Sequence, residues 1–181
     1  MKTPLILLGT IMVIIAGVAV FVWSGIYNVA ATQPHWDITY EFLEEVRDRS
    51  IAAHSRDVAA PSLSDPKLEL VGAAHYHHTC RLCHGAPGYL RLEFSMGLYP
   101  APPQLNSEEV QRWKNEELFW ITKNGLKMTG MPAFGLTGGD EELWATVVFL
   151  RRLPKLKAEE YDAMVKSGSS EHSHGHKTSH E

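Results

Sequence analysis

The chain has 181 residues, with 17 lysines and arginines against 21 aspartates and glutamates, and a formal net charge of −4 at pH 7 with histidine neutral. This length allows one ordinary domain with extensions. The slightly acidic balance argues against a nucleic-acid partner, which requires a strongly basic surface. The chain has only two cysteines, Cys80 and Cys83, so it lacks the dispersed cysteines of a disulfide-stapled secreted domain.

The first predicted element is an apolar segment at residues 4–27, which contains no charged side chain. About 20 apolar residues let a helix cross a bilayer, and Trp23 and Tyr27 suit the aromatic belt at its interface. We therefore predict a single-pass transmembrane anchor. The alternative is a signal peptide cleaved after Ala31, although a signal core of about 7–15 residues is shorter than this run. Both interpretations export the rest of the chain.

Residues 35–58 are predicted to form an amphipathic helix, because Trp36, Tyr40, Leu43 and Val46 recur at spacings of three and four. The opposite face carries charged side chains that are mainly acidic: Glu41, Glu44, Glu45, Asp48 and Arg49. A helix that lies on a membrane surface favours a basic polar face. We therefore expect a solvated spacer helix that packs against the main domain.

A linker rich in Pro and Ser at 61–66 separates this helix from a domain predicted over 67–154. Within the domain we expect three helices, at about 67–80, 107–124 and 140–152. Ser107 and Asp140 are the expected N-caps of the second and third helices. A short helical turn is possible at 155–166, and no alternating strand pattern appears. The predicted fold class is all-α, with three main helices preceded by the anchor and the amphipathic helix.

The residues with the clearest chemistry form a C-x-x-C-H pattern at Cys80, Cys83 and His84, which is a haem-attachment signature. Two thiols three positions apart lie on the same side of a helical turn, where they can add to the two vinyl groups at one edge of a porphyrin. The histidine that follows is a good ligand for haem iron. Gly85 then lets the chain turn away.

Two other uses of a C-x-x-C pair are possible. A thioredoxin-like redox pair would lie beside a strand–helix–strand pattern, which this sequence lacks. A zinc site needs further ligands at suitable spacing, and His75, His77 and His78 lie close in the sequence. The histidine directly after Cys83 favours haem over both.

Met131 is the candidate for the second axial position on the iron, and Met128 is its rival. Met131 lies between Gly130, which permits close approach to the ring, and Pro132, which fixes the backbone just after the sulfur. A thioether favours reduced iron, so a His/Met pair raises the reduction potential. The alternative role for these methionines is core packing.

The Cys80, Cys83 and His84 pattern, followed by Gly130-Met131-Pro132, resembles the class I mono-haem cytochrome c fold. The resemblance is strongest to the short membrane-bound bacterial cytochromes related to the haem c subunit, subunit III, of terminal oxidases. It covers residues 67–154 and extends to the 35–58 helix. It implies one covalent haem c attached at Cys80 and Cys83, with His84 and Met131 as the axial ligands.

The resemblance also implies how the haem is enclosed. Family members cross their first and last helices at small and aromatic residues, for which this chain offers Gly72, Tyr76, Trp144, Val148 and Phe149. A proline carbonyl is expected to accept the N–H of the proximal imidazole, and Pro100, Pro102 and Pro103 are all eligible. The candidate wall residues are Tyr76, Leu90, Leu92, Leu98, Tyr99, Leu105, Phe119, Trp120, Ile121, Leu126, Phe134, Val147 and Leu150.

Two protein ligands on the iron leave no position for a substrate, so we expect an electron carrier and not an enzyme. The family attaches its haem outside the cytoplasm, which places the haem domain in the periplasm of a bacterium, anchored in the inner membrane. The expected function is to shuttle single electrons between respiratory or dehydrogenase partners. The alternatives are a stably bound haem subunit of an oxidase or dehydrogenase complex, and a ligand-binding or catalytic haem protein with a labile sixth ligand. The sequence names neither donor nor acceptor.

The other histidines are concentrated in two places. Residues 167–181 form a polar tail that we expect to be disordered, and it carries His172, His174, His176 and His180. Histidine-rich tracts can bind copper, nickel or zinc, but a solvated tail is the favoured interpretation. His75, His77 and His78 are expected at the surface or the haem edge, with a bis-histidine haem as the alternative.

Overall fold

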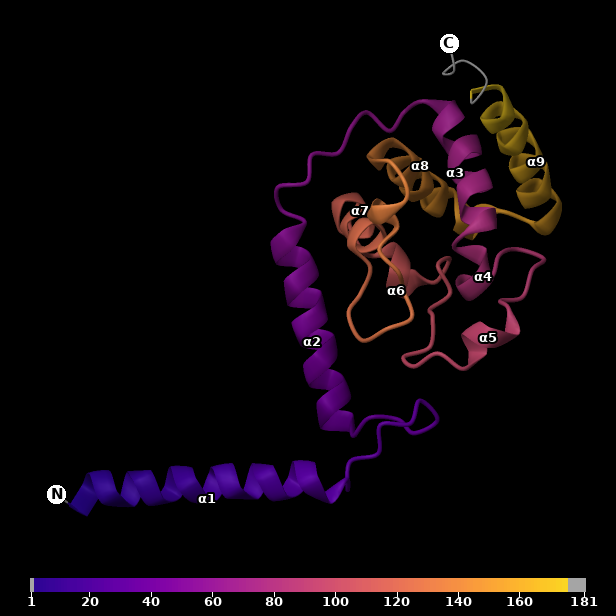
Figure 1. The fold of residues 1–181 in the computed structure, drawn as a ribbon. Coiled ribbons are helices and arrows are strands. Elements are labelled where there is room, and N and C mark those ends of the chain that lie inside the picture. The colour runs from indigo at the N-terminus through magenta and orange to yellow at the C-terminus, as the bar shows by residue number, and fades with distance from the viewer. Residues whose placement is uncertain (1, 176–181) are drawn as a thin grey trace, which may run out of the picture. The chain divides into compact units, whose positions relative to one another are not determined.

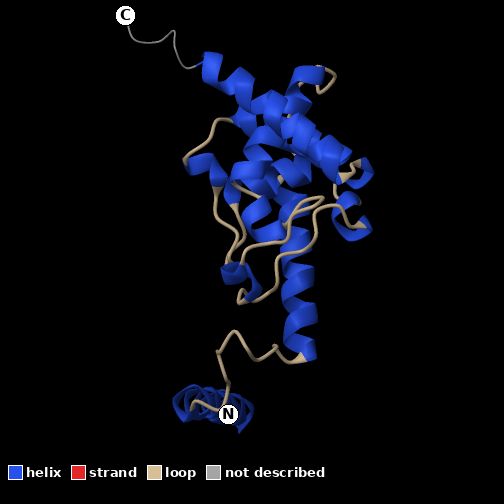
Figure 2. Ribbon diagram, turned by 90° about the vertical axis from the view of Figure 1, so that its right-hand side faces the viewer, coloured by secondary structure: helices blue, strands red, loops and turns tan. Residues whose placement is uncertain are grey.

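The computed structural model of the protein describes residues 2–175. The chain divides into two units, Met1–Pro34 and His35–Glu181. In the described residues all regular secondary structure is helical (Figure 2), and an isolated bridge between Ala86 and Tyr89 is the one β-type pairing. The predicted all-α fold class is confirmed.

The first unit consists of helix α1, Lys2–Ser24, and the segment that follows it. Residues Thr3–Ser24 have a mean hydropathy of 2.9 and none of their side chains is buried, so this one described helix is long and apolar enough to cross a membrane. It ends three residues before the predicted limit of 27, because Gly25 adopts a left-handed φ of 61°. An anchor and a signal sequence share these properties.

Helix α2, Asp37–His54, opens the second unit and packs against α7, Asn115–Asn124. Ile51 is 1% exposed, and the His54 ring lies 5.7 Å from that of Trp120. The predicted inner stripe is wrong in part, because Trp36, Tyr40 and Val46 are all exposed. The inward face instead follows Leu43, Arg47 and Ile51, which are spaced by four.

Helices α3, Pro66–His78, and α8, Asp140–Arg152, cross at the centre of the second unit (Figure 1). Gly72 makes the crossing possible, because an added Cβ would overlap the carbonyl oxygen of Ala145. Tyr76 packs on Phe149 with ring centroids 5.2 Å apart. Trp144 stacks on Phe119, with ring centroids 4.2 Å apart.

The predicted helix at 107–124 is two helices, α6, Glu108–Gln111, and α7. Ser107 caps α6 by accepting from the Val110 N–H, as expected. Arg151 of α8 holds the interruption open by donating to oxygens of Gln111, Trp113 and Asn115. This contact comes from a distant part of the chain, so a local pattern could not predict it.

Helix α8 has the predicted bounds, although Gly139 is its N-cap and Asp140 its first helical residue. The remaining short elements position loops and helix ends: α4 Arg81–His84, α5 Glu93–Met96, η1 Phe134–Leu136 and η2 Leu153–Lys155.

Helix α9, Ala158–Gly175, corrects the prediction of a tail disordered from residue 167. It packs along α3 on the side away from α8 (Figure 1). Tyr161 is fully buried, and Gly168 lies so close to α3 that an added Cβ would overlap the Leu70 carbonyl. The contact with α3 therefore stabilises a helix that is longer than the short helical turn expected at 155–166. Residues 176–181 of the predicted tail lie outside the described residues.

Candidate haem site

The C-x-x-C-H residues form one helical turn directly after α3. Cys80 is the N-cap of α4, and its carbonyl accepts from the N–H groups of Cys83 at 3.1 Å and His84 at 2.9 Å. Gly85 ends the turn with a φ of 73°. In a helical turn, residues three apart share a face. The structure therefore places the two thiols on one side of the turn.

Both cysteines are free thiols, and burial raises the pKa of Cys80 to about 11 and also raises that of Cys83. A thioredoxin-like redox pair or a nucleophilic cysteine requires a lowered thiol pKa. Burial of this pair instead raises the pKa of both thiols. The residues described also hold no group of three or more His, Cys, Asp or Glu that could bind a metal ion, so nothing there supports the zinc alternative.

His84 is oriented by a carbonyl of the loop that follows α5. Its Nδ1–H donates to the Pro103 oxygen at 2.7 Å, which leaves Nε2 with a lone pair. Burial lowers the pKa of His84, the bond to Pro103 raises it, and the charge of Arg91 lowers it. The result is a lowered pKa, which favours the neutral imidazole that a metal requires. Pro103, of the three eligible prolines, is the acceptor.

Met131 lies in a loop closed on itself. Thr129 Oγ1 donates to the Leu126 carbonyl at 2.8 Å and accepts from the Met131 N–H at 3.1 Å. Gly125 has a φ of 65°, and an added Cβ there would lie 2.7–2.8 Å from backbone atoms of residues 131–133. The turn before Met131 therefore depends on glycine.

The rival Met128 differs from Met131 in exposure. Met128 is 79% exposed and has a φ of 58°, whereas Met131 is partly buried. The neighbouring Gly130 lies against the Leu98 side chain, from the segment that leads to Pro103. These positions favour Met131 over Met128 as a ligand. The assignments of His84 and Met131 as axial ligands both remain predictions.

The candidate wall residues differ widely in burial. Those that are buried are Tyr76, Phe119, Val147 and Leu150. Those partly buried are Leu98, Tyr99, Leu105, Trp120, Ile121, Leu126 and Phe134. Leu90 is 91% exposed and Leu92 is 41% exposed, so Leu90 in particular lies away from the packed interior.

The sequence did not indicate several polar contacts around the turn. The Tyr76 hydroxyl donates to the Gly85 carbonyl at 2.6 Å, and burial raises the pKa of Tyr76. Tyr161 Oη lies 2.9 Å from His77 Nδ1, and the Tyr89 hydroxyl donates to Asp162 at 2.8 Å. These contacts of Tyr161 and Asp162 link helix α9 to α3 and to the loop after His84.

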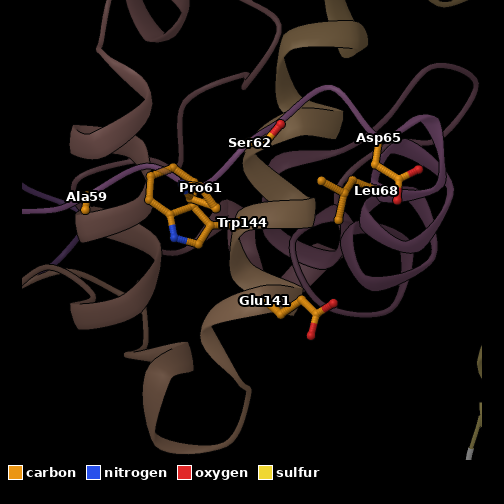
Figure 3. Close-up of a pocket in the computed structure, with 7 residues that line it drawn as sticks. All are labelled: Ala59, Pro61, Ser62, Asp65, Leu68, Glu141 and Trp144. Atoms are coloured by element: carbon orange, nitrogen blue, oxygen red, sulfur yellow. The ribbon is translucent and has the colours of Figure 1, made fainter.

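A separate surface pocket lies between the linker and helices α3 and α8 (Figure 3). Its lining residues are Ala59, Pro61, Ser62, Asp65, Leu68, Glu141 and Trp144. Asp65 is engaged as the N-cap of α3, where it accepts from the Lys67 N–H at 2.9 Å. The pocket contains neither the cysteines nor His84 and is distinct from the candidate haem site.

The residues present fit a covalent haem. The two thiols on one face of a turn suit thioether bonds to one porphyrin edge, and the His84 Nε2 suits the iron. A thioether from the 125–131 loop suits the other axial position.

A family model described as "Cytochrome C oxidase, cbb3-type, subunit III" matches residues 69–150, a span that includes the cysteine pair, His84 and Met131. A comparison with curated proteins gives no match.

Proposed function

We propose that this chain, whose residues 69–150 form a cytochrome c domain of the cbb3-type oxidase subunit III family, is a membrane-anchored electron carrier with one haem c. A cytochrome c domain carries haem c and transfers electrons. The proposal adds the axial ligands His84 and Met131, attachment at Cys80 and Cys83, and anchoring through α1.

The observation that carries the proposal is the turn at 80–85 with the Pro103 carbonyl beside it. A hydrogen bond from Nδ1 to a carbonyl fixes the ring orientation of a metal-binding histidine and raises its basicity. His84 makes this bond at 2.7 Å while the two thiols lie one turn away or less. In the proposed holoprotein, Cys80 and Cys83 hold the porphyrin edge, and His84 and Met131 hold the iron.

When bound, the haem supplies an iron that changes between Fe(III) and Fe(II) with little movement of its ligands. The chain's own task is to keep both ligands in place and to exclude water. The buried side chains of Tyr76, Phe149 and Leu150 lie in the same apolar cluster as Cys80 and provide this dry surrounding on the attachment side.

A stain for covalent haem tests the proposal. The exported wild-type protein should stain for haem on a denaturing gel, and Cys80→Ala with Cys83→Ala should abolish the stain. Wild-type protein that folds and is exported but gives no covalent stain would refute the proposal. Met96→Ala is a matched control at an exposed residue, and it should stain like the wild type.

The anchor has its own test. We propose that α1 remains attached and crosses the inner membrane of a bacterium, with the haem domain in the periplasm. N-terminal sequencing of protein from washed membranes should begin at the start of the chain. A mature protein that begins at Thr32 and washes off the membrane would show that α1 is a cleaved signal.

A second candidate function is a stably bound subunit of an oxidase or dehydrogenase. The family match favours it, because the matching family is described as an oxidase subunit. Mild detergent purification of the full chain separates the two. A free carrier purifies alone, whereas a subunit brings an integral-membrane partner in fixed stoichiometry.

A further inference from the structure

Arg91 lies beside the proximal ligand, at the end of the loop that follows His84. A turn between Ala86 and Tyr89 folds this loop back, and the Leu92 N–H donates to the Leu82 carbonyl at 2.8 Å. These bonds return the chain to the cysteine turn. Arg91 is partly buried at the point of return.

The Arg91 side chain contacts the same short segment that orients His84. Its Nη1 donates to the Pro102 carbonyl at 3.4 Å, and the next carbonyl, that of Pro103, accepts from His84. The guanidinium charge therefore lies next to the carbonyl that orients His84, on the proximal side of the candidate site.

Among the residues that the structure describes, this charge has no anionic partner. The four ion pairs among the described side chains involve Arg47, Arg49 and Lys123, and none involves Arg91. A guanidinium has five N–H donors, and one long hydrogen bond uses only one of those of Arg91. A partly buried charge is costly unless it is paired or well hydrogen-bonded.

Arg151 shows what a satisfied arginine looks like in this domain. It is also partly buried and has no carboxylate partner, but its guanidinium donates to oxygens of Gln111, Trp113 and Asn115. Compared with Arg151, Arg91 has more N–H groups available to donate to an oxygen ligand. The haem has two propionate carboxylates, and arginine suits planar bidentate binding of a carboxylate.

We propose that Arg91 binds a propionate carboxylate of the haem and thereby raises the reduction potential. The inference rests on the proposed haem function. A cation near the haem disfavours Fe(III) relative to Fe(II), because the oxidised form carries one more positive charge. An arginine also holds a neighbouring carboxylate ionised over the neutral pH range.

The test compares Arg91→Gln, Arg91→Lys and the control Arg152→Gln in the haem-loaded full chain. Arg152 is an exposed arginine at the end of α8, so it matches the charge change without the site. In Arg91→Gln we expect covalent haem, a lower reduction potential, and a potential that rises as pH falls because the unpaired propionate becomes protonated. In wild type and Arg152→Gln the potential should stay level between about pH 5 and 8, and Arg91→Lys should resemble them.

A potential and pH profile in Arg91→Gln equal to those of wild type would overturn the inference and leave the haem function intact. A change in thermal unfolding alone, with an unchanged potential, would also overturn it, because it would show a purely structural role. Loss of covalent haem from wild type would instead refute the proposed function itself.

If the Arg91→Gln variant does not acquire covalent haem, a measurement on the wild-type protein tests the pairing instead. Infrared redox difference spectra of haem labelled with ¹³C at the propionate carboxyls report their protonation. A propionate that stays ionised at about pH 5 supports the pairing, and two propionates that both titrate as free carboxylic acids contradict it.

Discussion

On the proposed proximal side, three backbone hydrogen bonds hold residues 80–85 in one turn, and the Pro103 carbonyl fixes the His84 ring. On the proposed distal side, the Met131 loop has one long backbone bond, from the Leu126 N–H to the Met131 carbonyl at 3.4 Å, and two bonds made by Thr129. The proximal geometry is therefore fixed by a tight turn and by one carbonyl from a separate loop. The distal geometry depends on one threonine and one glycine.

This difference explains why the two sides were not equally predictable. The proximal residues occupy fixed spacing in the sequence, and a short helical turn follows from that spacing. Pro103 could not be chosen over Pro100 and Pro102, because a carbonyl acceptor has no signature of its own. Met131 could be ranked above Met128 from its neighbours, but only the fold shows that Met128 is exposed.

The helices likewise divide into those whose bounds follow from local sequence and those whose bounds depend on contacts with distant residues. The bounds of α8 were predictable because acidic residues follow Gly139, basic residues occupy the last turn and Pro154 comes soon after. The interruption between α6 and α7 was not, because it depends on Arg151 from another helix. Only a short helical turn was expected at 155–166, because the polar sequence of α9 gains its stability from contact with α3, where Gly168 permits close approach.

The largest expected effect distinguishes the two methionines. Met131→Ala should keep covalent haem, because the proximal turn is intact, but open the iron to carbon monoxide. The reduction potential should fall by on the order of 0.2 V, since axial ligands tune potentials over roughly 0.8 V. Met128→Ala is the matched control and should behave as wild type. If the reduction potential fell in Met128→Ala and stayed at the wild-type value in Met131→Ala, Met128 would be the ligand instead.

The next effect compares two glycines with similar backbone conformation on opposite sides of the site. Gly85→Ala and Gly125→Ala should each lower the free energy of unfolding by about 1–3 kcal/mol, because both have positive φ. Only Gly125→Ala places a Cβ within 2.8 Å of the Met131 carbonyl, so only this variant should also weaken the methionine–iron absorption band. Equal loss of that band in both variants would show that the two sides are not independent.

A smaller effect is expected from Thr129→Val, which keeps the shape of the side chain. It removes a hydroxyl that donates to Leu126 and accepts from Met131. Unfolding free energy should fall by about 1–2 kcal/mol, and carbon monoxide should bind the reduced protein faster than it binds wild type. Unchanged binding would mean that other contacts hold the loop.

The smallest effect concerns α9. Tyr161→Phe removes the hydroxyl that lies 2.9 Å from His77 and keeps the buried ring. Chemical denaturation should show a loss of about 1 kcal/mol, with the visible spectrum and the potential unchanged. A shifted potential would show that α9 acts on the haem site and not only on stability.

The most direct test of the account is peptide mass spectrometry on the purified, exported protein. We predict one peptide containing Cys80 and Cys83 whose mass is increased by a single haem, with no other peptide modified in this way. The same peptide found unmodified, in protein that is folded and exported, would contradict the account.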